Sequence, residues 1–231
     1  MEKDRKIVLE IKDVVKYYHE PVEFKALKSI SFKVYEGEFL SVVGKSGCGK
    51  TTMMYILSTM DTDYEGELYI SGEKATGKKP DYLASIRNEH IGFVFQFHYL
   101  LPEFSCLKNV MIPALKLNKY SYEEIEQRAY EKLDLLGIKE QALKPASKIS
   151  GGQQQRVAIA RALINDPKII MCDEPTGNLD TKNTNIVVDI FRELAKEHGQ
   201  TIIAVTHDLD FSRRSSRTLE MRDGEVINHG W

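Results

Sequence analysis

The chain reads Gly44-Lys45-Ser46-Gly47-Cys48-Gly49-Lys50-Thr51 directly after the short apolar run 39–43. This octapeptide fits G-x-x-x-x-G-K-[ST], the pattern of a phosphate-binding loop. The apolar run predicts a strand at the centre of a sheet, and residues 50–60 predict a helix. Strand, glycine-rich loop and helix in this order form the context that the motif requires. The stretch therefore predicts an α/β fold that binds a nucleotide polyphosphate.

The predicted loop carries three kinds of phosphate-binding group. Consecutive backbone amides that lead into a helix bind phosphate oxygens, and glycines allow the backbone to approach closely. Lys50 is expected to reach the β- and γ-phosphates, and the Thr51 hydroxyl is expected to bind Mg²⁺. The expected ATP-binding residues of the loop are Gly44, Lys45, Ser46, Gly47, Cys48, Gly49, Lys50, Thr51 and Thr52.

Two acids, Asp173 and Glu174, follow the apolar run 169–172, at the end of a strand predicted over 168–172. At the end of a parallel strand, Asp173 can hold magnesium through a water, and Glu174 can orient or deprotonate an attacking water. An isolated Asp-Glu pair is usually a solvated strand end. Here the pair is not isolated, because the sequence continues Pro175-Thr176-Gly177-Asn178-Leu179-Asp180. This continuation favours a functional pair over a solvated strand end.

A second glycine-rich stretch stands between these two motifs and reads Ile149-Ser150-Gly151-Gly152-Gln153-Gln154-Gln155-Arg156. It opens a predicted helix over 152–164, so its amides and the Ser150 hydroxyl form an anion site. A phosphate loop, this stretch and an acid-capped strand in that order resemble the ATP-binding cassette ATPases, and the resemblance covers essentially the whole chain.

The resemblance implies a P-loop NTPase (RecA-like) core with a mostly parallel sheet, an N-terminal antiparallel β part and an inserted α-helical subdomain. The single domain spans 1–231, with 1–96 and 146–231 forming the β part and the core, and 97–145 forming the helical subdomain. The residues agree with this division, because Ser121-x-x-Glu124 is a capping box and strands alternate with helices after residue 168.

Further roles follow from the resemblance alone. Gln96 matches a glutamine that senses magnesium and water, and His207 matches a histidine that contacts the γ-phosphate. Tyr18 matches the aromatic residue that stacks on adenine, with Tyr17 left open as the alternative. Thr51, Gln96 and Asp173 are then the magnesium ligands, and Glu174, His207 and Gln96 the catalytic residues.

Residues 149–156 match the signature stretch of the family. This signature stretch is expected to complete the ATP site of another copy of the chain. In the family two cassettes pack head to tail, and Ser150, Gly151, Gly152, Gln153 and Asp180 of one chain complete the ATP site of the other. The implied cofactors are ATP and Mg²⁺. The implied partners are a second copy of this chain, in an ATP-dependent homodimer, and two transmembrane permease subunits.

Two segments narrow the resemblance to the lipoprotein-releasing ATPases. They are Phe93-Val94-Phe95-Gln96-Phe97-His98-Tyr99-Leu100-Leu101-Pro102-Glu103-Phe104 and residues 216–224. This resemblance implies an ATPase subunit that powers lipoprotein release through separate transmembrane subunits. The ATPase of a closely related macrolide-efflux or cell-division complex stays open as the alternative. The chain departs from the common pattern at Lys45, Cys48, Ile149 and Gln153-Gln154. The apolar residues of 97–104 are expected partly to pack under the helical insertion. The remainder, with Leu101 and Phe104, are expected to form a groove for a permease helix.

Composition sets the remaining expectations. The 231 residues carry a net charge of −2, so no basic field favours nucleic-acid binding. The N-terminal residues 1–6 lack the apolar part of a signal peptide, and no apolar run is long enough to span a bilayer. The resemblance to the lipoprotein-releasing ATPases then implies a place at the cytoplasmic face of a bacterial inner membrane, with indirect membrane contact. Arg213, Arg214 and Arg217 are expected to form a solvated basic face.

Two other classes of P-loop protein fit the sequence less well. A cassette ATPase that acts on DNA or ribosomes stays open as the less favoured alternative, because the chain has a single cassette and no basic stripe. A P-loop GTPase is disfavoured, since the chain lacks an N-K-x-D base-reading motif and contains the signature stretch.

Overall fold

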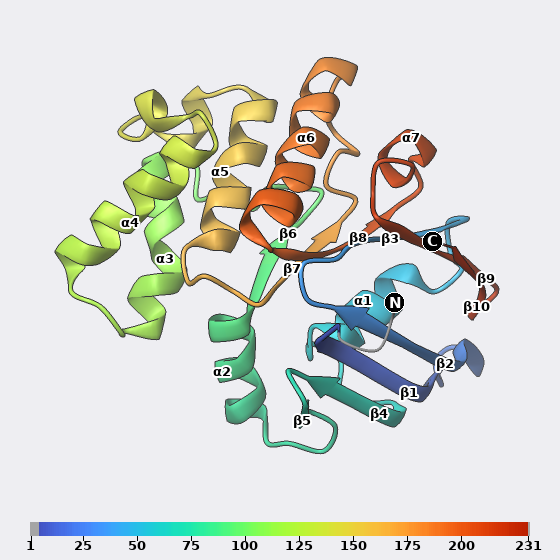
Figure 1. Ribbon diagram of the computed structural model, residues 1–231. Helices are drawn as coiled ribbons and strands as arrows, with labels where there is room; N and C mark the ends of the chain where they lie inside the picture. The colour runs from blue at the N-terminus through green and yellow to red at the C-terminus, as the bar shows by residue number, and fades with distance from the viewer. Residues whose placement is uncertain (1–4, 231) are drawn as a thin grey trace.

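The computed structural model describes residues 5–230, so residues 1–4 of the segment considered for a signal peptide lie outside the described range. Within this range the chain forms two β-sheets with helices around them (Figure 1). The first sheet is antiparallel and has the order β2-β1-β4-β5. Its strands are β1 (Ile7–Tyr18), β2 (Phe24–Tyr35), β4 (Glu65–Ile70) and β5 (Glu73–Lys74).

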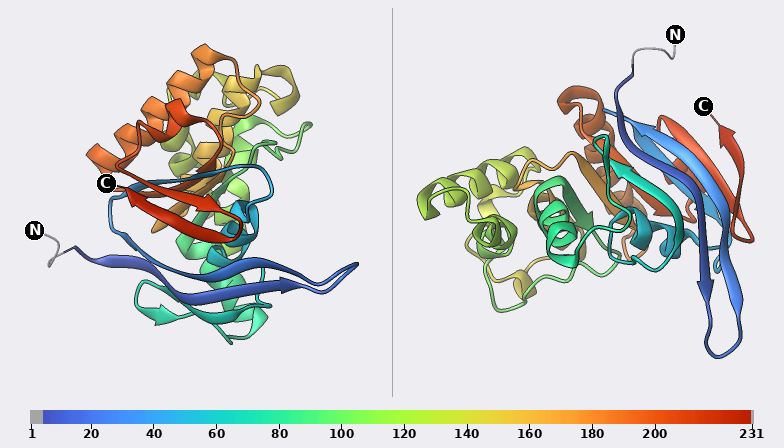
Figure 2. Two further views of the ribbon diagram at one scale, coloured as in Figure 1. Left: turned by 90° about the vertical axis from the view of Figure 1, so that its right-hand side faces the viewer. Right: turned by 90° about the horizontal axis from the view of Figure 1, so that it is seen from below.

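The β1–β2 pair sets the position of the end of β1. The two strands pair antiparallel from Ile7 opposite Tyr35 to Tyr18 opposite Phe24. Figure 2 shows that the hairpin they form projects from the body of the molecule. The N-terminal antiparallel part predicted from the sequence is therefore confirmed, and Tyr18 lies at the turn end of its hairpin.

The second sheet is mostly parallel and has the order β10-β9-β3-β8-β7-β6. Neighbouring strands from β9 to β6 pair in parallel, and β10 pairs antiparallel with β9. The bounds are β3 (Phe39–Gly44), β6 (Ile91–Val94), β7 (Ile169–Asp173), β8 (Thr201–Thr206), β9 (Arg217–Arg222) and β10 (Glu225–Gly230). Because parallel strands end at one edge of a sheet, the residues that follow β3, β6, β7 and β8 lie near one another.

Helices cover the second sheet and extend to one side of it (Figure 1). Their bounds are α1 (Lys50–Leu57), α2 (Pro80–His90), α3 (Cys106–Leu117), α4 (Tyr122–Leu135), α5 (Gly151–Leu163), α6 (Thr181–His198) and the short α7 (Leu209–Ser212). The capping box of α4 forms as predicted, since the Ser121 hydroxyl accepts from the amide of Glu124 and the Glu124 carboxylate accepts from the amide of Ser121. The helix α2 was not predicted.

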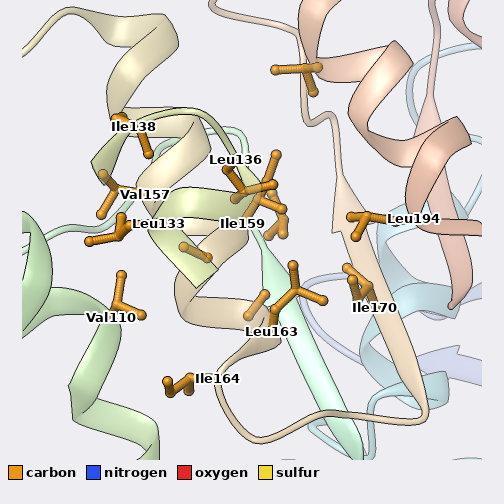
Figure 3. Close-up of a cluster of buried hydrophobic side chains, with 14 of the residues drawn as sticks. Val110, Leu133, Leu136, Ile138, Val157, Ile159, Leu163, Ile164, Ile170 and Leu194 are labelled. Atoms are coloured by element: carbon orange, nitrogen blue, oxygen red, sulfur yellow. The ribbon is translucent and has the colours of Figure 1, made fainter. Parts of the chain in front are cut away.

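Two clusters of buried side chains hold these layers together. One joins β1 and β2 to α1 and to the strands of the second sheet. The other joins α3, α4 and α5 to α6 and to the opposite face of the second sheet. Figure 3 shows part of it, where Val110, Leu133 and Val157 approach one another from α3, α4 and α5. The helices of the insertion thus share one continuous core with the sheet.

The expected basic face is wrong for Arg217. Its side chain is 6% exposed, and its Nε lies 2.7 Å from Oε1 of Glu38, which is itself buried. Arg213 pairs on the surface with Asp210, and Arg214 pairs with Asp189. Among the described residues, no helix has the length and apolarity that crossing a membrane requires.

Candidate functional site

A cavity of about 620 Å³ opens where the strands of the second sheet end. Loops after β3, β6, β7 and β8 supply most of its wall, and the β1–β2 hairpin supplies the rest. The lining residues are Tyr18, Phe24, Ala26, Ser46, Gly47, Gly49, Lys50, Thr51, Thr52, Gln96, Asp173, Glu174 and His207. The fold therefore brings together residues that lie up to 189 positions apart in the sequence.

The side chain of Lys50 binds the backbone of the phosphate loop to which it belongs. Lys50 is 7% exposed, and its Nζ donates to the carbonyl oxygens of Gly44 at 2.8 Å and Lys45 at 3.1 Å. Gly49 has a φ of 104°, and a Cβ there would lie 2.8 Å from the carbonyl oxygen of Ala26. A side chain at position 49 would thus be both strained and obstructed. The contacts of Lys50 and the conformation of Gly49 together fix the shape of the loop.

Three predicted loop residues lie outside this cavity. Gly44, Lys45 and Cys48 instead line a second hollow of about 740 Å³ beside the β9–β10 hairpin. The carbonyl of Cys48 accepts from the amide of Gly224 at 3.1 Å, and a Cβ on Gly44 would lie 2.3 Å from the carbonyl oxygen of Met221. These contacts show that Gly44 and Cys48 pack the loop onto the hairpin, whereas Lys45 between them is exposed.

Two adjacent acids face the cavity. Burial and the neighbouring Glu174 raise the pKa of Asp173, and Lys50 opposes this shift. Glu174 has a φ of +47°, its amide donates to Val205 at 2.9 Å, and its carbonyl accepts from Gly177 at 3.1 Å. A non-glycine residue in this region is uncommon and is kept there by its surroundings. The turn after β7 therefore aims the Glu174 side chain by backbone contacts.

His207 and Gln96 complete the polar wall. Nδ1 of His207 lies 2.9 Å from Oε1 of Glu174. The carbonyl of Gln96 accepts from Asn178 at 3.1 Å, and a Cβ on Gly177 would lie 2.9 Å from Nε2 of Gln96. Gln96 is thus packed directly against the loop that follows Glu174.

The oxygen ligands expected for Mg²⁺ fit a nucleotide-bound ion. Thr51, Gln96 and Asp173 all line the same cavity, and each offers an oxygen. Magnesium prefers oxygen ligands and usually takes only one or two carboxylates beside phosphates and water. In the described part of the chain, no three His, Cys, Asp or Glu side chains gather as a metal site. This arrangement suits an ion that arrives with phosphates.

The two tyrosines at the end of β1 differ in surroundings. Tyr18 lines the cavity, and its hydroxyl lies 3.4 Å from Oγ1 of Thr52. Tyr17 stacks on His19 and is not among the lining residues. Phe24 was not singled out from the sequence, although it pairs across the hairpin with Tyr18 and lines the cavity. Only the register of β1 and β2 reveals that pairing.

The signature stretch lies away from this cavity, since none of Ser150, Gly151, Gly152, Gln153 and Asp180 lines it. Ser150 and Gln153 form a capping box that starts α5. A Cβ on Gly152 would lie 2.1 Å from Oδ1 of Asn183, whose Nδ2 donates to both carboxylate oxygens of Asp180. Asn183 was also missed from the sequence. It places the signature and Asp180 side by side.

A more apolar groove of about 470 Å³ lies between α2, α3, α5 and the end of β6. Phe93, Phe95, Tyr99 and Pro113 are among its lining residues. The guanidinium of Arg161 fixes the segment after Gln96 by donating to the carbonyls of His98 and Tyr99, both at 2.7 Å.

The expectation for this segment is correct in part. Leu100 packs against the core, and Tyr99 lines the groove. Leu101 and Phe104 are each 44% exposed, but neither lines the groove. The reason is Asn109, which binds Leu101 through both its amide and carbonyl and so turns the chain away from the groove.

Comparisons with known proteins agree with this geometry. The sequence profile of the ABC transporter family matches residues 27–177. The chain is 45% identical over 204 residues to the lipoprotein-releasing system ATP-binding protein LolD of Aquifex aeolicus, covering 88% of this chain and 90% of that protein. It is 44% identical over 200 residues to LolD 1 of Chlorobium chlorochromatii, covering 87% and 81%.

Solved structures resemble the whole fold. The dimeric structure of MJ0796, a bacterial ABC transporter cassette, superposes with a TM-score of 0.87 at 40% identity, covering 95% of this chain and 97% of that one. A dimeric post-hydrolysis state of MJ0796 bound to ADP and phosphate gives the same values. The predicted α/β fold with a P-loop core is therefore confirmed.

Proposed function

Since this chain belongs to the ABC transporter family, we propose that it is the ATP-hydrolysing subunit of a complex that releases lipoproteins from a bacterial inner membrane. Both LolD proteins described above carry the name of that system. The cavity that gathers the phosphate loop, Gln96, Asp173, Glu174 and His207 carries the proposal of ATP hydrolysis, and the 45% identity to LolD carries the proposal of lipoprotein release.

Hydrolysis follows from the groups around that cavity. The loop amides and Lys50 bind the phosphates, for which Lys50 exchanges its contacts with the carbonyls of Gly44 and Lys45. Glu174 orients the attacking water and accepts its proton. His207 holds the Glu174 carboxylate through Nδ1 and lies beside the position of the γ-phosphate. The P–O bond to the leaving ADP breaks as water adds.

Three residues would hold magnesium, namely Thr51, Gln96 and Asp173. The ion would neutralise charge on the phosphate oxygens. Burial and the neighbouring Glu174 raise the pKa of Asp173, and the positive charge of the ion would favour the ionised carboxylate.

A second copy of the chain is the proposed partner in catalysis. Ser150, Gly151, Gly152, Gln153 and Asp180 do not line the cavity of their own chain, although the N-terminus of α5 offers amides for an anion. Packing two copies head to tail would place each signature over the other chain's ATP. The dimeric structures of MJ0796 support a dimer of such cassettes.

Two permease subunits are the proposed membrane partners, and the chain then works at the cytoplasmic face of the inner membrane through them. The groove that Phe93, Phe95 and Tyr99 line is where a short permease helix would bind. It lies next to Gln96, so closure around ATP would reach the permease through the segment that Arg161 fixes.

The test is to reconstitute this chain with the permease subunits whose genes lie nearest to its own gene. Vesicles loaded with a lipidated protein should transfer it to a soluble carrier when ATP is added. The Lys50→Ala complex should assemble and release nothing. If the complex assembled and hydrolysed ATP but bound and moved another class of cargo, lipoprotein release would be wrong.

A further inference from the structure

Lys16 is a buried lysine of β1 that the hydrolysis mechanism does not use. It is 4% exposed, and its Nζ lies 3.1 Å from Oδ1 of Asp61, 3.0 Å from Oδ2 of Asp63 and 2.6 Å from the carbonyl oxygen of Asp63. Burial disfavours the ammonium, but the bonds to Asp61 and Asp63 outweigh it and raise the pKa of Lys16. The lysine is therefore charged and fixed in place.

The ammonium of Lys16 lies beside the ring of Tyr18, at the end of the cavity where we expect the adenine of ATP to bind. Nζ of Lys16 is 5.2 Å from the centroid of the Tyr18 ring, within the range of a cation–π contact. Tyr18 lines the cavity and Lys16 does not. The cation thus approaches the ring from within the protein and leaves the cavity side for a ligand.

The same contacts connect Tyr18 to the helix that follows the phosphate loop. Asp61 and Asp63 lie just after α1, and the Tyr18 hydroxyl lies 3.4 Å from Oγ1 of Thr52 within α1. The ring is thus linked to α1 through its hydroxyl and to the segment that follows α1 through Lys16. Because α1 begins at the phosphate loop, these contacts fix the distance between the ring and the phosphate site.

We propose that Lys16 is a positioning residue for nucleotide binding, which holds the Tyr18 ring at the height of the base and strengthens the stacking of that ring on adenine. A cation beside an aromatic ring draws on the negative charge of its face, so the face repels a stacked base less. The inference rests on the proposed function, because it requires a ligand that carries a base as well as phosphates.

The decisive comparison is between ATP and inorganic tripolyphosphate, which has the phosphates and lacks the base. Binding of each to the full chain is measured by calorimetry. Lys16→Met keeps the apolar stem and removes the charge, and it should weaken ATP about three- to tenfold while leaving tripolyphosphate unchanged. In hydrolysis assays KM for ATP should rise while kcat stays near its original value. Lys16→Arg should restore ATP binding.

Lys12 of the same strand provides the matched control. Its Nζ lies 4.7 Å from the ring of Tyr69, which does not line the cavity. Lys12→Met should leave the affinities for both ligands unchanged. Asp61→Asn is the second variant in case Lys16→Met fails to fold. It keeps the charge of Lys16 but weakens the contact that holds the ammonium in place. It should weaken ATP selectively in the same direction.

A double variant tests whether Lys16 acts through Tyr18. Tyr18→Ala should weaken ATP about tenfold, and adding Lys16→Met should cost nothing further. Additive losses, equal losses for ATP and tripolyphosphate, or no loss at all would overturn the inference while leaving the proposed function intact. Failure of the unaltered chain to bind ATP would overturn both.

Discussion

Nδ1 of His207 lies 2.9 Å from Oε1 of Glu174, and the backbone amide of His207 lies 3.4 Å from Oε2. The two residues follow β8 and β7, which are neighbouring parallel strands, so the sheet itself sets their separation. The Glu174 side chain is 18% exposed. Its carboxylate is therefore held from the adjacent strand, in the wall of the cavity that we propose binds ATP.

Replacing Glu174 with Gln tests its role as the base. The amide has nearly the same shape and keeps a contact with His207, but it takes up no proton. We expect Glu174→Gln to bind ATP normally and to lower phosphate release by roughly 10²–10⁴-fold. It should also accumulate as an ATP-bound dimer on a sizing column. Glu193→Gln, at an exposed position of α6, should hydrolyse normally. Near-normal turnover by Glu174→Gln would exclude the assignment.

Complementation tests whether two chains share each site. Lys50→Ala should lose productive phosphate binding, and Ser150→Arg should keep the phosphate loop but block closure over it. In a mixed dimer both defects fall on one composite site, and the other site is intact. We expect phosphate release from the mixture and none from either variant alone. Proven mixed dimers without any gain would contradict sharing across chains.

Asp173 should make the nucleotide-free protein less stable as the pH rises. Its pKa is raised in the folded state by burial and by Glu174, so the fold binds more protons than the unfolded chain above pH ~4. Stability is then lost as the pH rises through the folded pKa. Asp173→Asn removes this loss, and we expect its Tm at pH 7 to exceed that of the unaltered chain by about 2–4 °C.

The Tm difference should shrink toward pH 4, and measuring it by calorimetry between pH 4 and 7 checks the sign. Asp134→Asn, which alters an exposed pair with Lys139, is the control and should show no such trend. A difference that is independent of pH would mean that the ionisation of Asp173 is not its cause.

Arg217 provides a stability test outside the site. Its guanidinium meets Glu38 at 2.7 Å and also donates to the carbonyl of Lys33 at 2.6 Å, so it joins β9 to the end of β2. Arg217→Met leaves the buried Glu38 carboxylate without this partner, and we expect a loss of roughly 3–5 kcal/mol in urea unfolding. Arg222→Met, at a surface pair with Glu220, should change stability by less than about 0.5 kcal/mol. Equal effects would contradict the buried-pair account.

Local patterns were sufficient to predict most of the site. The phosphate loop, the acids after β7 and the histidine after β8 each follow a short apolar run, and parallel strands bring such ends together without further information. The capping boxes at Ser121 and Ser150 are set by residues three positions apart. These features depend on contacts within one segment or on the general geometry of a parallel sheet.

The missed features depend on contacts between distant segments. Phe24 enters the cavity because of its register with Tyr18, and Arg217 is buried because β9 lies against β3, whose neighbour along the chain is Glu38. The helix α2 buries only Leu83 and Ile86, which is too sparse an apolar pattern to distinguish it from a loop. In each case the structure depends on residues that are distant in the sequence, so a short stretch of sequence does not reveal it.

The groove beside Gln96 allows the permease contact to be separated from hydrolysis. Tyr99 is 65% exposed and lines the groove, whereas Leu101 has a similar loop position, is 44% exposed and points elsewhere. We expect Tyr99→Ser to reduce co-purification with the permease subunits and to uncouple transport, because the aromatic wall that would grip a helix is lost. ATP hydrolysis by the isolated chain should stay within about twofold, since no contact to Glu174 or the phosphate loop changes. Leu101→Ser is the matched control and should assemble and transport normally. If Leu101→Ser were the damaging change and Tyr99→Ser were silent, the permease would bind the exposed face of this segment, and the groove would not be the contact.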